Sequence, residues 1–458
     1  MKQVLITILF LCAIFHNGKS QTWNAVGSGF TNIIGYPHCI QPLEKLYLSP
    51  DYSPCNFAGE QVKGVFHFDG TNADSLGSGV AGYANAVQWY NGKLIVAGEF
   101  NYAGGPTQWT IPHTNSIAAW DSVNGWSSIT PLGNLDYQVN AMTEYQGNLY
   151  VAGDFVSVNN LSVNRIAKWN GTSWSNVGGG VQGSITKIYS MVVYHGQVYI
   201  GGDFTVAGPS NISTRYIARW NGSQWSSVGG GMSYTVNDLV VDTVNDVLYA
   251  CGAFTQAGNT TAYGVARWND SIWTPVGSGM DTLWATQRLG MFNGELYAGG
   301  PCITTTLQGD TLRNFYKYNG TKWISVDGGT NNPVLSMGVF QGNLYVGGAF
   351  TQVGNGINAS RIACYGTTCP VSVGVSEQEP PVPFRMYPNP NDDVLHIESE
   401  EPQQMIFRLS SSDGKLIEEK KFFNKIDHSI KALAPGTYFV EISLVDGSRR
   451  HVEKLIVK

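Results

Sequence analysis

Short runs of alternating apolar and polar residues follow one another along most of the chain and predict β-strands. Within residues 140–181, the pattern predicts strand A at 141–145, strand B at 148–155, strand C at 165–169 and strand D at 173–177. Gln146-Gly147 and Asn170-Gly171 predict two-residue turns between A and B and between C and D, because these pairs tolerate positive φ. About ten residues separate B from C. Four short strands with tight turns predict one antiparallel sheet.

One phrase, Gly-x-Leu-Tyr-Val-x-Gly-x-Phe, recurs in strand B and shows that this sheet is a repeated unit. Its fourth position, usually tyrosine, is occupied at intervals of 48 to 55 residues by Tyr47, Ile95, Tyr150, Tyr199, Tyr249, Tyr297 and Tyr345. A four-stranded sheet with two apolar faces cannot bury both alone, whereas sheets packed radially bury both. The sequence therefore predicts an all-β fold, a seven-bladed β-propeller.

The repeat also predicts how the ring closes. Strand D carries a Trp-x-x-Val motif, or Trp-x-x-Ile in one unit, at Trp126, Trp174, Trp225, Trp273 and Trp323. The seventh unit ends at residues 361–366 with no such strand, and a matching motif begins at Trp23. We expect this N-terminal outer strand to complete the last blade, because pairing the termini removes two open sheet edges.

Composition narrows the class of protein. Charged residues make up only 13% of the chain, and there are 55 glycines, 13 tryptophans and 23 tyrosines. This balance excludes a disordered chain and a long coiled coil. A net charge of −6 offers no basic surface for nucleic-acid phosphates, so no nucleic-acid partner is expected.

The N-terminus predicts export. Lys2 precedes an apolar run at 4–15, and small residues before Gln21 place a signal cleavage site between Ser20 and Gln21. The run is too short to span a membrane, and no later stretch is long enough, so no transmembrane segment is expected in the mature chain.

Export to an oxidising compartment permits disulfides. Six cysteines remain after the signal peptide, and their proximity in sequence favours the pairs Cys39 with Cys55 and Cys364 with Cys369. Cys251 and Cys302 are left unassigned. No Cys/His cluster has the spacing of a metal site, so no metal is expected.

The C-terminal part of the chain differs in composition. Residues 371–384 are rich in proline and predict a stiff linker after a propeller at 21–370. Residues 385–458 hold 23 of the 60 charged residues. Alternating runs at 394–397, 406–409, 437–442 and 452–457 predict a small immunoglobulin-like β-sandwich.

The repeats at 21–370 resemble those of kelch and galactose-oxidase-like β-propellers. Galactose oxidases hold copper with two tyrosines and two histidines, but the histidines of this segment are His38, His67, His113 and His195. His195 occupies the A–B turn position held elsewhere by Gln146. The resemblance therefore implies the architecture and neither copper nor another cofactor.

The C-terminal segment resembles the sorting domain of the type IX secretion system. The resemblance rests on three motifs in order, formed by Tyr387, Pro388, Asn389 and Pro390, by Gly436 and Tyr438, and by the terminal strand from Lys454 to Lys458. It implies a Bacteroidota-type bacterium, the type IX machinery as partner, and export across the outer membrane to the cell surface or the medium.

In a propeller the A–B and C–D turns lie on one face, and the B–C and D–A loops on the other. The tight turns offer little to a ligand, whereas variable loops on a rigid scaffold commonly carry binding residues. The candidate ligand-binding residues of the loop face are Tyr102, Trp109, His113, Tyr234, Trp284 and Arg288. Exposed aromatic side chains there could stack on sugar rings or anchor a protein.

Acidic residues recur at the end of strand B as Glu99, Asp154 and Asp203. Arg165 and Arg215 begin strand C beside them, so ion pairs across the hairpin are expected. The leading hypothesis is a non-enzymatic exported propeller that binds glycan or protein through its loop face. The alternatives are a polysaccharide hydrolase or lyase with carboxylates in the propeller mouth, which would need a carboxylate pair, and a structural or adhesion component.

Overall fold

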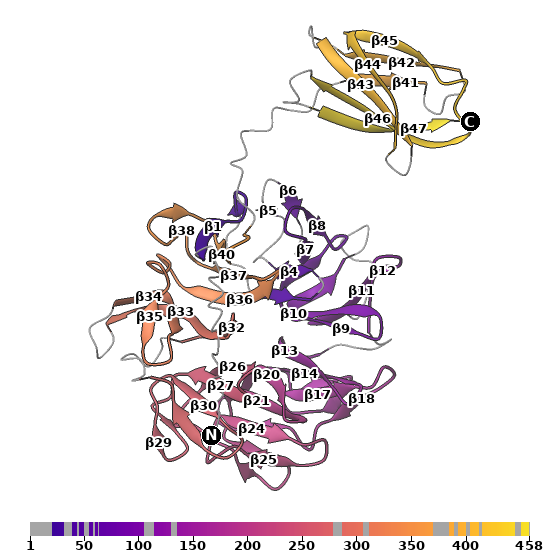
Figure 1. Ribbon diagram of the computed structural model, residues 1–458. Coiled ribbons are helices and arrows are strands. Elements are labelled where there is room, and N and C mark those ends of the chain that lie inside the picture. The colour runs from indigo at the N-terminus through magenta and orange to yellow at the C-terminus, as the bar shows by residue number, and fades with distance from the viewer. Residues whose placement is uncertain are drawn as a thin grey trace, which may run out of the picture. The chain divides into compact units, whose positions relative to one another are not determined.

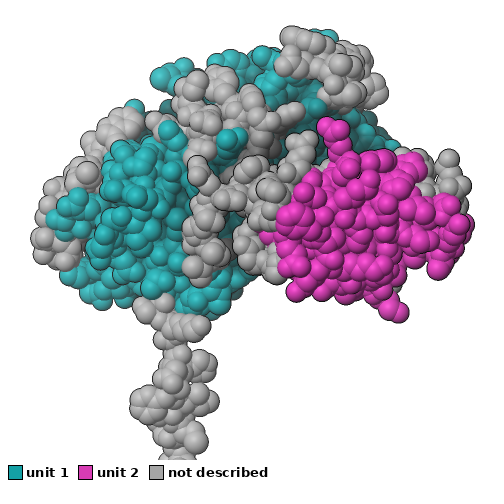
Figure 2. All heavy atoms as spheres, turned by 90° about the horizontal axis from the view of Figure 1, so that it is seen from above, with its two compact units in different colours: residues 1–373 teal, residues 374–458 magenta. Residues whose placement is uncertain are grey.

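The computed structural model describes residues 21–31, 39–43, 45–49, 55–57, 60–62, 64–104, 114–129, 135–277, 286–305, 311–369, 384–388, 393–399, 404–411, 415–444 and 450–457. Residues 1–373 and 374–458 form two compact units (Figure 2). The predicted signal peptide and most of the predicted linker lie outside the described residues. Within the described part, no helix is long and apolar enough to cross a membrane.

The first unit contains, among its described residues, seven four-stranded antiparallel sheets (Figure 1). The first three are β3 (Cys39–Pro42), β4 (Leu46–Ser49), β7 (Phe66–Phe68) and β8 (Ala73–Ser75); β9 (Val80–Tyr90), β10 (Lys93–Ala103), β11 (Ile117–Asp121) and β12 (Gly125–Ser127); and β13 (Val139–Tyr145), β14 (Asn148–Gly153), β17 (Ile166–Trp169) and β18 (Trp174–Asn176). The next two are β20 (Lys187–Tyr194), β21 (Gln197–Asp203), β24 (Ile217–Trp220) and β25 (Trp225–Ser227); and β26 (Val236–Asp242), β27 (Val247–Gly252), β30 (Val265–Trp268) and β31 (Trp273–Pro275). The sixth is β32 (Arg288–Phe292), β33 (Glu295–Thr305), β34 (Thr311–Tyr318) and β35 (Trp323–Ser325).

The seventh sheet combines the two ends of this unit. Its order is β1 (Thr22–Ala25), β40 (Ile362–Gly366), β37 (Asn343–Gly348) and β36 (Val334–Phe340). Trp23 is registered opposite Tyr365. The N-terminal segment therefore occupies the outer position that strand D holds in the other sheets.

The first strands of successive sheets contact one another. β3 contacts β9, and the contacts continue through β13, β20, β26 and β32 to β36, which in turn contacts β3. Figure 1 shows the sheets side by side around this set of strands.

The recurring strand-B phrase has a packing explanation. Its aromatic residues are buried between sheets, with Tyr150 at 1% and Phe155 at 0% exposure. A Cβ on Gly153 would lie 2.3 Å from the carbonyl oxygen of Gln138, so the first strand approaches too closely for any side chain. The same close approach occurs at the equivalent positions Gly98, Gly202, Gly252 and Gly348.

The turns confirm one prediction and correct another. Gln146 and Gly147 both have positive φ, at 49° and 70°, as a type I′ turn requires. The C–D connection was predicted as a two-residue turn of the same type, and this prediction is wrong. Trp169 pairs with Trp174, which leaves a four-residue loop in which Asn170 Oδ1 accepts the N–H groups of Thr172 and Ser173 at 2.9 and 2.8 Å. The hairpin is therefore closed by a longer loop that the asparagine side chain caps, in place of a two-residue turn.

The B–C connections contain short hairpins where the sequence suggested loops. They are β5 (Cys55–Phe57) with β6 (Glu60–Val62), β15 (Ser157–Val158) with β16 (Leu161–Ser162), β22 (Val206–Ala207) with β23 (Ile212–Ser213), β28 (Gln256–Ala257) with β29 (Thr260–Thr261), and β38 (Gln352–Val353) with β39 (Ile357–Asn358). β2 (Phe30–Thr31) pairs with β5, and β19 (Val181–Gln182) pairs with β22.

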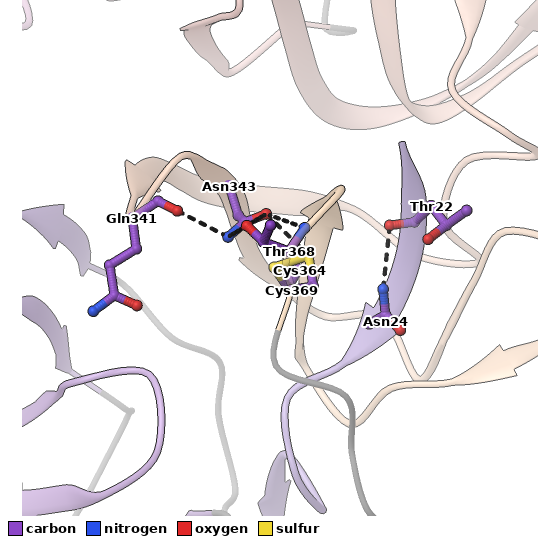
Figure 3. The surroundings of a disulfide bond; sticks show 7 residues. All are labelled: Thr22, Asn24, Gln341, Asn343, Cys364, Thr368 and Cys369. Atoms are coloured by element: carbon purple, nitrogen blue, oxygen red, sulfur yellow. Dashed lines mark hydrogen bonds between the residues drawn. A yellow bond between two sulfur atoms is a disulfide. The ribbon is translucent and has the colours of Figure 1, made fainter. Parts of the chain in front are cut away.

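Cys364 and Cys369 form a disulfide, as predicted (Figure 3). The buried Asn343 beside it donates to the Gln341 carbonyl oxygen at 3.0 Å and accepts the Thr368 N–H at 3.2 Å. The disulfide therefore links β40 to the residues that follow it at the end of the propeller segment. The side chains of Cys39, Cys55 and Cys302 lie outside the described part, and Cys251 is buried as a free thiol.

The second unit is a seven-stranded sheet. Its order is β41 (Phe384–Tyr387), β42 (Val394–Ser399), β45 (Lys425–Ser429), β44 (Leu416–Phe423), β43 (Gln404–Ser411), β46 (Gly436–Leu444) and β47 (Arg450–Val457). β44 and β45 are joined only through Phe423 and Lys425. Side chains from both sides of this junction share one core, including Leu395, Phe407 and Val440. The charged sequence of β44 hid this strand from pattern analysis.

Candidate functional site

The first strands of six sheets (β9, β13, β20, β26, β32 and β36) line a cavity of about 460 Å³, which we call the channel. Residues near the start of these strands line one end and are mainly polar, among them Asn85, Asn140, Ser190, Asp238, Arg288 and Ser336. Residues further along the same strands are mainly apolar, among them Met142, Val192, Val240, Met291 and Val339. Strand A begins on the side of the B–C and D–A loops, so the polar end opens towards the loop face.

A recurrent bulge in strand A places amide side chains at the polar end. The pairing of β13 with β14 shifts register at Asn140, and the pairing of β9 with β10 shifts at Asn85. Asn85 Nδ2 donates to the Val139 carbonyl oxygen at 2.9 Å, and Asn140 Nδ2 donates to that of Ile188 at 2.9 Å. Each bulge therefore hydrogen-bonds its sheet to the next.

The fourth to sixth sheets add other side chains, although the fifth keeps the bulge asparagine, since Asn237 Nδ2 donates to the Thr286 carbonyl oxygen at 3.1 Å. In β20, Tyr189 occupies the bulge position in place of asparagine. The hydrogen bond between neighbouring sheets is made there by Asp238, which accepts the Ser190 hydroxyl at 2.8 Å and the Leu289 N–H at 3.0 Å. Burial raises the pKa of Asp238, while the nearby Arg288 opposes the shift. These three sheets thus bring a phenol, a carboxyl and a guanidinium to one side of the channel.

The mouth of the channel is a concavity of about 240 Å³ lined by Tyr83, Asn85, Gln138, Asn140, Tyr189 and Arg288. Two aromatic rings, three amides and one cation face a single space. Small polar sites that orient a ligand are built from such groups. We refer to these six residues as the channel mouth.

Asp154 holds two side chains of the channel mouth, Gln138 and Asn140, in place. Its carboxylate accepts hydrogen bonds from Gln138 Nε2 and Asn140 Nδ2, each at 2.9 Å, and lies 2.7 Å from Lys187 Nζ. This contact raises the pKa of Lys187. The expected ion pair with Arg165 is a wrong prediction, since Arg165 donates to the backbone carbonyl of Asp154 and the carboxylate faces the next sheet.

The loops around the mouth are fixed to one another by a repeated contact. A side-chain oxygen in the D–A segment accepts two consecutive backbone N–H groups of the following B–C hairpin. Asp136 receives those of Val156 and Ser157 at 2.9 and 3.0 Å. Ser233 and Asn331 make the same contact in two other sheets. In these three sheets the D–A segment is therefore tied to the B–C hairpin that follows it.

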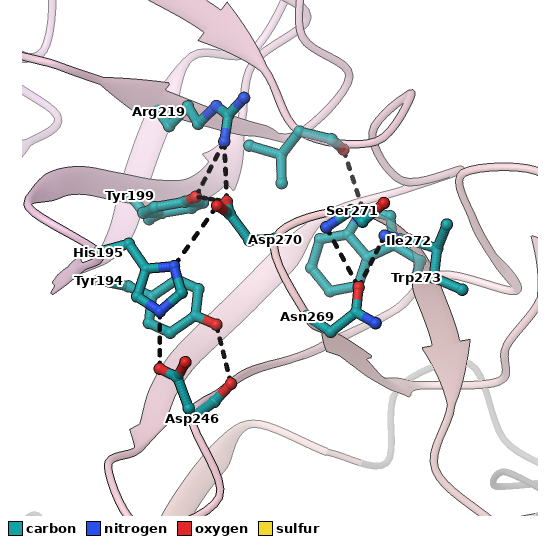
Figure 4. A network of polar contacts seen from close by, with 11 residues as sticks. Tyr194, His195, Tyr199, Arg219, Asp246, Asn269, Asp270, Ser271, Ile272 and Trp273 are labelled. Atoms are coloured by element: carbon teal, nitrogen blue, oxygen red, sulfur yellow. Dashed lines mark hydrogen bonds and ion pairs between the residues drawn. The ribbon is translucent and has the colours of Figure 1, made fainter.

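The opposite face carries a separate polar network (Figure 4). His195 lies in the turn between β20 and β21, as predicted, with its Nε2 2.7 Å from Asp246 Oδ1 and its Nδ1 3.4 Å from Asp270 Oδ2. Arg219 Nη1 lies 3.0 Å from Asp270 Oδ1. The hydrogen bond with Asp246 raises the pKa of His195. This network joins the fourth and fifth sheets.

The predicted ligand-binding residues lie in different places. Arg288 lines both the channel and its mouth. Tyr234 is 46% exposed before β26 and packs against Tyr216 with ring centroids 5.7 Å apart, and Tyr102 lies half-buried in β10. Trp109, His113 and Trp284 lie outside the described residues.

The sorting-motif residues lie in the second unit. Tyr387 is 42% exposed, and its hydroxyl donates to Glu398 Oε2 at 3.1 Å. The Tyr438 hydroxyl donates to the Ala434 carbonyl oxygen at 2.9 Å, which folds the turn before Gly436 onto β46. Lys454 lies in β47 opposite Phe439. Asn389, Pro390 and Lys458 lie outside the described residues.

Five residues of the channel mouth were missed by sequence analysis. They are Tyr83, Asn85, Gln138, Asn140 and Tyr189. Aligning the starts of strand A would show a signal, because Asn85, Asn140 and Asn237 share one bulge position that Tyr189 interrupts. These side chains come together only because neighbouring sheets pack against one another, so the sequence of one strand does not reveal their convergence.

Two family models match parts of the chain. Residues 385–458 match the secretion system C-terminal sorting domain, and residues 91–111 match the domain of unknown function (DUF5122) beta-propeller. No curated protein matches the chain.

Two solved structures resemble the chain at low similarity. One is PorZ, an essential bacterial surface component of the type-IX secretion system of Porphyromonas gingivalis, with 15% identity, a TM-score of 0.38 and coverage of 97% of this chain. This chain spans 58% of the PorZ chain. The other is a fungal alcohol oxidase of the AA5 family in complex with copper, with 11% identity, a TM-score of 0.40 and coverage of 96% of this chain and 100% of that one.

The repeats, the sheets they form and the matched C-terminal segment lead to one conclusion. The chain is a β-propeller protein with a C-terminal sorting domain of the type IX secretion system, and it is exported across the outer membrane to the cell surface or the extracellular space.

Proposed function

We propose that this protein is a closed seven-bladed propeller that binds an extracellular glycan at the channel mouth, on its B–C and D–A loop face. The observation that carries the proposal is the convergence of Tyr83, Asn85, Gln138, Asn140, Tyr189 and Arg288 on one concavity. The sorting domain delivers this surface to the exterior, where glycans are available.

The side chains of the channel mouth suit a polyhydroxylated ligand. Among the described residues, the Tyr189 hydroxyl, Gln138 Oε1 and Asn85 Oδ1 have no hydrogen-bond partner, while the amide nitrogens of Gln138 and Asn85 are held by the protein. Hydroxyl groups donate and accept, so they match this mixture of groups. The tyrosine rings supply apolar surface for the faces of a sugar.

Closure of the ring supports the proposal because the mouth exists only if the first strands encircle the channel. The contacts of β36 with β3 and of β3 with β9, together with the pairing of β1 with β40, support a closed ring. The apolar residues below the mouth, such as Met291 and Val240, favour a polar ligand that stays at the entrance.

The acidic residues near the mouth favour binding over hydrolysis. The Asp154 carboxylate is held by two amides and Lys187, Glu99 Oε2 accepts the Tyr83 hydroxyl at 2.6 Å, and Asp238 accepts hydrogen bonds on both oxygens. These carboxylates hold the wall in place. The volume of about 240 Å³ suits one group of a saccharide better than a folded protein.

A glycan-array screen of the mature full-length chain, followed by calorimetry on the bound glycan, tests the proposal. Replacing Tyr189 by Ala should weaken binding at least about tenfold. Replacing Tyr263 by Ala, an exposed tyrosine outside the channel mouth, should leave affinity unchanged. Absence of glycan binding, equal loss in both variants, or depolymerisation of the glycan would overturn the proposal.

A further inference from the structure

Arg288 is the cation of the channel mouth. It begins β32 and lines both the mouth and the deeper channel. Its Nη1 donates to the Gln287 carbonyl oxygen at 2.9 Å, and no described carboxylate lies within ion-pair distance of it. Because a guanidinium carries five N–H donors, most of its hydrogen-bonding capacity is available.

The other charged groups nearby are already paired or hydrogen-bonded. Lys187 and Asp154 form an ion pair at 2.7 Å. Asp238 lines the channel but accepts hydrogen bonds from Ser190 and from the N–H groups of Leu239 and Leu289 at 2.8 to 3.0 Å. Within the described residues, Arg288 is thus a half-buried cation whose charge helps to stabilise the nearby Asp238 carboxylate. Its N–H donors, apart from the one bound to Gln287, are hydrogen-bonded to no described anion.

We infer that the ligand of the channel mouth is an acidic saccharide whose carboxylate pairs with Arg288. This inference rests on the proposed function and adds the chemical class of the glycan. A carboxylate accepts two parallel N–H hydrogen bonds from a guanidinium. This paired contact fixes the position of the sugar and selects a sugar that carries a negative charge.

The neighbouring groups complete the recognition of such a sugar. The Tyr189 hydroxyl, Gln138 Oε1 and Asn85 Oδ1 line the same mouth and are open to ring hydroxyls. A single guanidinium matches the single charge of a carboxylate. A phosphate carries up to two charges and would be better served by a cluster of cations, whereas Lys187 is already bound to Asp154.

The test uses the mature full-length chain and pairs of probes that differ only in charge. Trigalacturonate and triglucuronate are each compared with their methyl esters by calorimetry, alongside a sulfated trisaccharide and a neutral one. At least one acidic trisaccharide should bind at least about tenfold more tightly than its ester. Rising salt should weaken binding of the acid and leave binding of the ester unchanged.

Variants assign the effect to Arg288. Arg288→Gln should abolish the preference for the acid over its ester, and Arg288→Lys should restore only part of it, because an ammonium cannot make the paired contact. Arg267→Gln is the matched control, since Arg267 lies outside the channel mouth and donates to Thr274. If Arg288→Gln does not fold, the comparison of acid and ester in the unaltered chain still decides the matter.

The two proposals fail differently. Equal affinity for acid and ester, or a sulfated probe bound as well as the carboxylates, overturns the role assigned to Arg288 and leaves glycan binding in place. A loss of affinity in Arg267→Gln equal to that in Arg288→Gln also overturns it. If no saccharide binds, neutral or acidic, the proposed function itself is wrong.

Discussion

The indole N–H of Trp23 donates to the carbonyl oxygen of Val326 at 3.3 Å, across 303 residues of sequence. The equivalent tryptophan of four other sheets makes the same bond to the preceding sheet, at 2.6 to 3.1 Å, through Trp126, Trp225, Trp273 and Trp323. Trp23 therefore has the contacts of a strand-D tryptophan although it lies at the other end of the propeller segment. Its ring also lies 5.2 Å from that of Phe315 and 5.1 Å from that of Tyr365.

Replacing Trp23 by Ala should lower the free energy of unfolding by about 3–5 kcal/mol, because a buried aromatic side chain and an intersheet hydrogen bond are lost. Urea denaturation of the mature chain measures the change. Trp174→Ala is the control, since Trp174 is half-buried and its indole N–H has no partner among the described residues. A cost for Trp23→Ala no larger than for Trp174→Ala would show that the N-terminal strand does not hold the last sheet.

Asp154→Asn should destabilise the protein by about 1.5–3 kcal/mol, because it removes the charge that Lys187 and two amides are oriented to meet. Asp203→Asn should cost less, since Asp203 is less buried and accepts a hydrogen bond from Thr235 at 3.1 Å. Denaturant midpoints compare the two. The larger cost at Asp203 would contradict this account of the recurrent acids.

The turn residue His195 should make stability depend on pH. The hydrogen bond with Asp246 raises its pKa above the usual 6.5 in the folded protein. The contribution to stability is then fully present below pH 6.5 and is lost as the pH rises through the raised folded-state pKa. His195→Gln, which introduces the residue type found at the equivalent turn position Gln146, should be less stable than the unaltered chain near pH 5.5 and should approach it near pH 8.5. A difference that is independent of pH would rule out this role.

Removing the disulfide should cost stability through the entropy of the unfolded chain. The loop between Cys364 and Cys369 is short, with a separation of 5 residues, so the double replacement by Ser should cost only about 2 kcal/mol. Thermal unfolding with and without a thiol reductant measures it. The reductant should lower the melting temperature of the unaltered chain by more than that of the double variant. Equal shifts in both would assign the effect to another disulfide.

The architecture of the repeat could be predicted from the sequence because it is determined by contacts within one unit or between neighbouring units. The turn residues at Gln146 and Gly147, the glycine at 153 that strand A approaches, and the strand-D tryptophans each respond to a constraint within one unit or between neighbouring ones. The turn after Trp169 was misjudged because Asn170 can cap a loop with its side chain as well as adopt a positive φ. The charged strand β44 was missed because most of its side chains face solvent.

The sequence by itself determined the number and order of the repeats, the N-terminal strand that completes the last one, the pair Cys364 and Cys369, and the address carried by residues 385–458. Only the tertiary structure decided that Tyr189 and Arg288 share one cavity with Gln138 and that Asp154 faces Lys187. The physical reason is that the repeated residues determine the fold of each unit and its packing against the next unit. A site at the axis is assembled from one or two side chains of each of several units. The sequence of a single strand therefore does not show that these side chains lie together.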